Sequence, residues 1–131
     1  MFSDALLDHF RNPRHVGELP APAITVEVSN PACGDILKLS AVFDGDRVAE
    51  TGYRVRGCTA SIAAGSALTE LITGQTRTAL AALSAADIEE RLGGLPPASK
   101  HVAALCIDGV RALLKAAARV PLNRVQIDLD S

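Results

Sequence analysis

The sequence predicts an α+β fold: a small three-stranded antiparallel sheet with helices packed on one face. Two observations lead to this prediction. Apolar and polar residues alternate with a period of two in three stretches before Cys58, and the period changes to about 3.6 after it. Strands grouped ahead of most of the helices are typical of α+β domains, whereas α/β domains alternate the two.

Turn residues separate the three alternating stretches. The predicted strands are residues 24–29, 35–43 and 47–56. Asp44-Gly45-Asp46, between the second and third stretch, is a hairpin signal, so these two strands are expected to pair directly. The far ends of such a pair meet. The turn at residues 30–34 is therefore expected to lie near Gly57-Cys58.

Helical periodicity and helix-end residues divide the rest of the chain. A first helix is expected over residues 3–11, with Ser3 as its N-cap and Asn12-Pro13 after it. The later helices are expected from Thr59 or Ser61 (either of which could be the N-cap) to about Thr73, over residues 76–83, from Ser84 to Leu92, and from about Ala98 to Arg119. Ser84 and Asp87 have the spacing of a capping box.

Length and composition predict a single domain over residues 1–131. The chain has 131 residues, of which 48% are apolar and only 3% aromatic, so its core must consist mainly of Ala, Leu, Val and Ile. Residues 122–131 are expected to be a flexible tail or a short strand.

Charge gives no support for nucleic acid or a membrane as a partner. The net charge is −2, with 13 basic and 15 acidic residues, and no apolar run reaches the roughly 18–20 residues that span a bilayer. No signal-peptide pattern is visible at Met1, which leads us to expect a cytoplasmic protein. Three cysteines then favour metal or thiol chemistry over a disulfide framework.

Cys33 and Cys58 are the strongest candidates for chemistry. Each has a glycine beside it, which can present a sulfur on a tight turn, and each lies at the end of a predicted strand. Cys58 also lies at a predicted helix start, where the backbone favours a thiolate. We interpret the pair as soft-metal ligands, in preference to two small buried apolar residues.

Other residues could complete such a site. Asp35 could be a third ligand, a hydrogen-bond acceptor behind the ligands, or simply the cap of a turn. His101, near the start of the last helix, could be a ligand if that helix start lies near the thiolates. Cys106 lies on an apolar stripe and could equally be a core residue. His9 and His15 are interpreted as packing or surface groups.

Four segments, in this order, resemble the U-type iron–sulfur cluster scaffold family, which includes IscU, SufU and the N-terminal domain of NifU. They are residues 8–17 (DHFRNPRHVG), residues 30–35 (NPACGD), residues 57–63 (GCTASIA), and Leu95-Pro96-Pro97 followed by His101. The resemblance covers roughly residues 4–118. Any one segment would be weak evidence, but all four at similar spacing are specific.

The resemblance implies a scaffold on which a [2Fe-2S] cluster is assembled from iron and from sulfur supplied by a cysteine desulfurase. The cluster is then passed to apo acceptor proteins. By this resemblance Cys33 and Cys58 correspond to the first two ligand cysteines. Asp35 corresponds to an aspartate associated with cluster lability, and His101 to a histidine that precedes the family's third cysteine.

The chain departs from the family at that third cysteine, because Val102 occupies its position. Cys106 follows one helical turn later, about 40° around the helix and about 6 Å along it. Three alternatives follow. Cys106 is a ligand in a shifted site; or the ligands are Cys33, Asp35, Cys58 and His101, with Cys106 in the core; or the chain is a degenerate member with a regulatory role.

A second departure concerns an Hsp70-type chaperone. Leu95-Pro96-Pro97 matches the start of the segment that IscU-type members present to it, but Ala98-Ser99 does not match the two residues that follow. The sequence therefore does not support this partner.

The same ligands would also suit Zn²⁺, which would make the chain a zinc-binding regulator of a desulfurase. An interaction domain without metal is another alternative. A thiol enzyme using Cys58 and His101 would need an orienting third group and an oxyanion hole, which the sequence does not indicate. We therefore expect a scaffold and not an enzyme.

Overall fold

A computed structural model describes residues 2–31 and 34–119. It contains a sheet of three antiparallel strands in the order β1-β2-β3, formed by β1 (Ile24–Ser29), β2 (Ile36–Asp44) and β3 (Arg47–Arg56). The predicted α+β class and the antiparallel sheet are confirmed. The predicted boundaries of β1 and β3 agree with the structure, whereas β2 begins and ends one residue later than expected.

The hairpin between β2 and β3 forms where the sequence predicted it. Asp44 pairs with Arg47, and Gly45 takes a φ of +61° in the two-residue loop, a conformation that glycine adopts without steric cost. A register shift follows between Val42 and Phe43. From there the pairing runs regularly to the far end of the hairpin, where Ile36 lies opposite Arg56.

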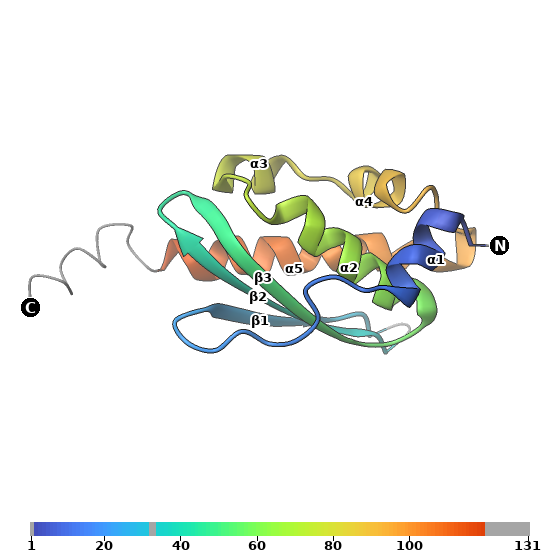
Figure 1. Cartoon of the computed structure of the whole chain (residues 1–131), viewed down its shortest axis with the longest axis horizontal. Helices are drawn as coiled ribbons and strands as arrows, with labels where there is room; N and C mark the ends of the chain where they lie inside the picture. Colours follow the sequence, from blue (N-terminus) through green and yellow to red (C-terminus); the bar gives the residue numbers. More distant parts are fainter. Residues whose placement is uncertain (1, 32–33, 120–131) are drawn as a thin grey trace, which may run out of the picture.

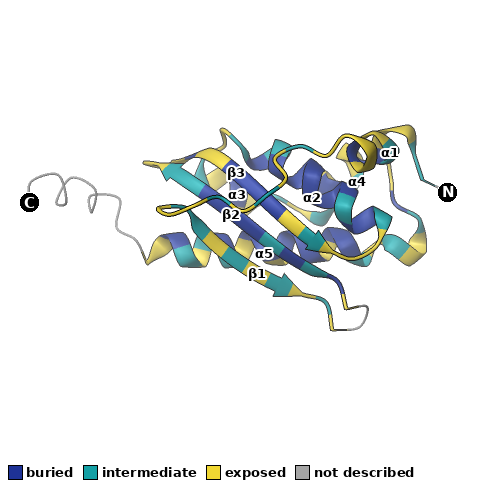
Figure 2. Ribbon diagram, turned by 60° about the horizontal axis from the view of Figure 1, so that its bottom comes forward, coloured by how far each residue is buried: buried dark blue, intermediate teal, exposed yellow. Residues whose placement is uncertain are grey.

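Helices cover one face of the sheet (Figure 1). The helix α2 (Thr59–Ile72) packs on β3, and α5 (His101–Ala118) packs on β1 and β2. The short helices α3 (Arg77–Ala82) and α4 (Ala85–Arg91) lie outside this layer and contact α5, and α4 also contacts α2. Buried residues follow the facing sides of the sheet and of α2 and α5 (Figure 2). No helix among the described residues is long and apolar enough to span a membrane.

Close packing at glycine attaches α2 to the sheet. A Cβ at Gly65 would lie 2.4 Å from the Tyr53 ring, so only glycine allows the helix to approach β3 this closely. The Tyr53 hydroxyl donates to the Ile62 carbonyl of the same helix at 2.8 Å. This contact fixes the direction in which α2 leaves the end of β3.

Two helix starts differ from the prediction. Cys58 is the N-cap of α2, with φ −79° and ψ 175°, whereas Thr59 and Ser61 lie inside the helix. The strand runs into the helix with almost no loop, and Cys58 is the last extended residue. The last helix begins at His101 and not at Ala98, because a 3₁₀ turn, Pro97–Ser99, precedes it. The capping box of Ser84 and Asp87 is confirmed.

The helix α1 (Asp4–Arg11) is held against α2 by a buried histidine. Ser3 caps it as predicted, and Leu6 and His9 are its buried residues. The Nδ1 atom of His9 lies 2.7 Å from the Ser66 hydroxyl, which also accepts the backbone N–H of Arg14 at 2.9 Å. His9 is thus a packing group, as the sequence predicted, and His15 is exposed on the loop after α1.

The surroundings of His9 favour its neutral form. Burial is the main cause that lowers its pKa from the ordinary value of 6.5, and the positive charge of Arg14 adds to it. The nearest groups are Arg14, with Nη1 3.2 Å from Nδ1, and Glu70, with Oε1 3.4 Å from Nε2. A protonated Nδ1 could no longer accept from Ser66 or from Arg14.

We predict that His9 makes the protein acid-sensitive. The pKa of His9 is lower in the folded protein than in the unfolded chain, so below pH 6.5 the unfolded chain binds more protons at this residue. The free energy of unfolding should therefore fall as the pH falls. Urea unfolding at pH 7.5 and at pH 5 measures this change. Between the two pH values, the free energy of unfolding should decrease less for His9→Gln than for the wild type.

The exposed His15 supplies the control. His15→Asn should keep the pH dependence of the wild type, and asparagine tolerates the positive φ of 58° at this position. An equal pH-dependent loss in His9→Gln and in the wild type would contradict the prediction.

Candidate metal site

The candidate site lies where β2 begins and β3 ends. Because Ile36 pairs with Arg56, the adjoining residues Asp35 and Gly57 come together at this end of the hairpin. Cys58 follows directly, and its Sγ atom lies 4.0 Å from Oδ2 of Asp35. The prediction that the two far strand ends meet is confirmed for Asp35 and Cys58.

Asp35 is the centre of this group of side chains. The residue is only 6% exposed, and a buried carboxylate is costly unless hydrogen bonds or charges compensate for the lost water. The Ser61 hydroxyl donates to its Oδ2 atom, and Nε2 of His101 lies 3.5 Å from the same oxygen. The starts of β2, α2 and α5 therefore converge on one carboxylate.

Cys58 is accessible, as a ligand for an incoming metal must be. Its residue is exposed and is the N-cap of α2. Its sulfur lies 3.2 Å from the Ser61 hydroxyl. His101, at the first position of α5, is half-buried, with its side chain 31% exposed.

Cys106 has a different environment. It is 2% exposed within the core, and burial raises the pKa of its thiol to about 12. Its position next to Tyr53 also contributes, after burial, to raising the pKa of the Tyr53 hydroxyl to about 12. Val102, one turn earlier, is fully buried. Cys106 therefore presents no thiolate to solvent, and Val102 has no thiol.

Cys33 lies outside the described residues, as does the segment 122–131 that was expected to be a tail or a short strand. Within the described part of the chain, no three Cys, His, Asp or Glu side chains form a group that could hold a metal ion. Cys58 and His101 each lie near the same Asp35 oxygen, so sulfur, imidazole and carboxylate donors come close to one another without being arranged as a ligand group in this structure. This donor set fits borderline-soft metals such as iron and zinc.

Sequence analysis did not identify Ser61 as part of the site, and it assigned Gly57 a different role from the one it has in the structure. Ser61 follows Cys58 by three residues, a spacing that places two helical side chains on the same face and could have indicated it. Gly57 was expected to present the sulfur on a tight turn, but of the two glycines that adjoin Cys33 and Cys58, only Gly34 has a positive φ (+77°). At Gly57 the reason is space: a Cβ there would lie 2.7 Å from Oδ1 of Asp35.

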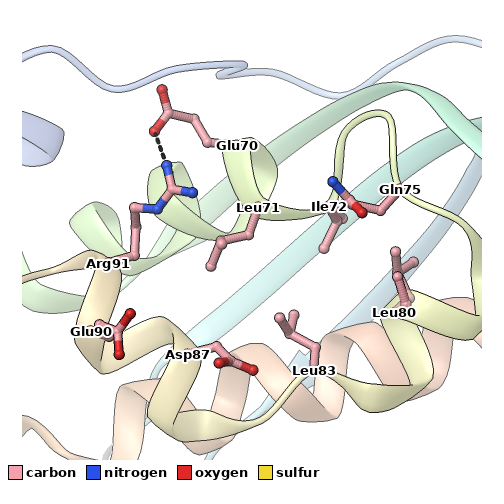
Figure 3. Close-up of a pocket in the computed structure, with 10 residues that line it drawn as sticks. Glu70, Leu71, Ile72, Gln75, Leu80, Leu83, Asp87, Glu90 and Arg91 are labelled. Atoms are coloured by element: carbon pink, nitrogen blue, oxygen red, sulfur yellow. Dashed lines mark hydrogen bonds and ion pairs between the residues drawn. The ribbon is translucent and has the colours of Figure 1, made fainter.

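A separate cleft of about 550 Å³ lies between α2, α3 and α4 (Figure 3). Leu71 and Leu83 contribute apolar surface to it, and Arg91 pairs with Glu70 across its rim at 3.5 Å. Asp35, Cys58 and His101 do not line this cleft. Its lining includes no cysteine or histidine, so the soft-metal donors are gathered elsewhere.

A thiol, a carboxylate and an imidazole at one end of a small helix-covered sheet define a candidate metal-binding α+β domain. Comparison with known families gives a more specific result. Residues 1–121 match the NifU-like N terminal domain, and the chain belongs to this family. The family resemblance inferred from the four sequence segments is thus confirmed.

Individual relatives agree with this assignment. The chain is 43% identical to the bifunctional protein NifU/MnmA of Rubrobacter xylanophilus, with 83% of this chain aligned but only 23% of the relative. It is 34% identical to the iron-sulfur cluster assembly scaffold protein IscU 1 of Archaeoglobus fulgidus, with 85% of this chain and 72% of the relative aligned.

Solved structures share the fold. FiSufU of Fervidobacterium islandicum superposes with a TM-score of 0.69 at 19% identity, with 86% of this chain and 96% of the other covered. The N-terminal part of a NifU-like protein from Brucella abortus gives a TM-score of 0.60 at 18% identity, with 89% of each chain covered.

We predict that Gly57→Ala destabilises the protein. The added methyl group would overlap the Asp35 carboxylate, and overpacking of this kind typically costs about 1–3 kcal/mol of the free energy of unfolding. Urea unfolding measures the loss. In an Asp35→Ala background most of it should disappear, and an unchanged loss there would show that the carboxylate is not the obstacle.

We predict that Cys58 and Cys106 differ strongly in reactivity. With a pKa of about 12, only about one Cys106 thiol in ten thousand is ionised at pH 8, and burial shields it further. In a Cys33→Ser variant, a disulfide reagent at pH 8 should therefore modify one thiol rapidly in the native protein. The denatured protein should show two, and two rapid thiols in the native protein would contradict the prediction.

Proposed function

We propose that this protein is an iron–sulfur cluster assembly scaffold. In this proposal it binds iron and a transient [2Fe-2S] cluster and transfers the cluster to apo acceptor proteins. The observation that carries it is the accessible Cys58 thiol beside the buried Asp35 carboxylate, with His101 on the same oxygen. Membership of the NifU-like family and relatives named as scaffold proteins support it.

The proposed ligands are Cys33, Asp35, Cys58 and His101. Cys106 is proposed to be a core residue and not a ligand, because a buried thiol with a raised pKa lacks the thiolate that binds iron. Val102, fully buried, leaves no ligand at the position of the family's third cysteine.

This ligand set suits a cargo that must leave again. Thiolates are the usual protein ligands of iron–sulfur clusters, whereas a carboxylate and an imidazole are harder donors that hold iron less firmly. Cys58 is exposed and His101 is partly exposed, so a cysteine desulfurase and an acceptor protein could reach the cluster. We propose that the protein carries the cluster and does not catalyse a reaction. We propose the cytoplasm as the place where it acts.

A second candidate function is zinc binding by a regulator of the desulfurase. The buried positions of Val102 and Cys106 favour it, because they leave two of the three cysteines for a site. Two sulfur atoms with one carboxylate and one imidazole can bind Zn²⁺ in tetrahedral geometry.

We predict that anaerobic reconstitution with iron, sulfide and a cysteine desulfurase yields a coloured protein. About two iron and two sulfide ions per cluster are expected, with visible charge-transfer absorption. Cys58→Ala should lose this absorption because it removes a proposed ligand. Cys106→Ala is the matched cysteine control. It should keep the absorption because it removes only a small thiol group from the core.

Two outcomes would contradict the scaffold proposal or its ligand set. Loss of the cluster in a folded Cys106→Ala protein would make Cys106 a ligand in a rearranged site. A wild-type protein that takes up zinc but no cluster under the same conditions would favour the regulator.

A further inference from the structure

Ser61 occupies an unusual place in the candidate site. It is the third residue of α2, is 3% exposed, and directs its hydroxyl toward groups outside the helix. A serine within a helix often donates to the backbone carbonyl four residues earlier. Here the hydroxyl instead donates to Oδ2 of Asp35 and lies 3.2 Å from Sγ of Cys58.

We propose that Ser61 is a positioning residue of the metal site: its buried hydroxyl holds the Asp35 carboxylate in the orientation that serves a metal beside Cys58. This inference rests on the proposed function. It assigns a role to a side chain that is not itself a ligand. The role follows from three features of the contact between Ser61 and Asp35.

The first feature is the burial of both partners. Asp35 and Ser61 are each more than nine-tenths buried, so little water can replace a lost hydrogen bond. A hydrogen bond to a charged group also contributes more than one between neutral groups. The Ser61 hydroxyl is therefore a principal stabiliser of the carboxylate in this orientation.

The second feature is the orientation itself. Ser61, Cys58 and His101 all face the same carboxylate oxygen, Oδ2. The other oxygen, Oδ1, faces the space that Gly57 leaves open, where a Cβ would be 2.7 Å away. The hydroxyl on one side and the backbone of Gly57 on the other thus restrict rotation of the carboxylate.

The third feature is that one rigid element holds both Ser61 and Cys58. They lie three residues apart at the start of α2, and the packing of Gly65 on Tyr53 fixes this helix on the sheet. A hydrogen bond from α2 to Asp35 therefore also sets the distance between the carboxylate and the sulfur. Loss of such a bond behind a ligand typically lowers metal affinity by about 10- to 100-fold.

The test is a double-mutant cycle on the affinity for Zn²⁺ alone, measured by competition with a chelating dye. Ser61→Ala should weaken binding by about tenfold or more. Asp35→Ala should weaken it at least as much. The double variant should bind like Asp35→Ala, because Ser61 acts through that carboxylate. Co²⁺ absorption spectra of Ser61→Ala should change in the same direction as those of Asp35→Ala.

The matched control is Ser66→Ala, which removes another buried serine hydroxyl from the same helix, one that bonds His9 and not the site. Its Zn²⁺ affinity should equal that of the wild type. Circular dichroism verifies that each variant is folded, and Ser61→Gly removes the same hydroxyl should Ser61→Ala fail to fold.

Unchanged Zn²⁺ affinity in Ser61→Ala would overturn the inference. So would a loss that persists in full in the Asp35→Ala background, because Ser61 would then act by another route. Failure of the proposed site itself has a different result: Cys58→Ala would then bind Zn²⁺ as tightly as the wild type.

Discussion

The pairing register of β2 and β3 is the constraint on which the candidate site depends. Ile36 opposite Arg56 places Asp35 against Gly57 and delivers Cys58 to the same end of the hairpin. A slip of one residue would move every side chain of β2 to the other face of the sheet. The buried Leu37 and Leu39 would then face away from α2 and α5, so burial of the core fixes the register and thereby the site.

Packing of helices on that hairpin completes the arrangement. The helix α2 begins directly after β3 and is held by the contact between Gly65 and Tyr53, while α5 begins with His101 after the turn at Pro97–Ser99. Two helix starts and one strand start thus meet at Asp35.

Burial decides which cysteines can do chemistry. Cys58 and Cys106 both belong to long helices, but Cys58 is the exposed N-cap of α2, whereas Cys106 lies on the face of α5 that packs in the core. The same physical principle separates the two histidines of α1 and its following loop. His9 is buried against α2 as a neutral packing group, and His15 is exposed.

The sequence by itself determined the α+β class, the three strands, the hairpin and most helix ends, because alternation, turn residues and caps are local properties. It also identified Asp35, Cys58 and His101 as candidates and showed that Val102 stands where the family has a cysteine. Only the tertiary structure showed that Cys106 is buried, that Gly57 makes room for a carboxylate, and that Ser61 joins Asp35 to Cys58. These facts depend on contacts between residues more than twenty positions apart, which no local pattern encodes.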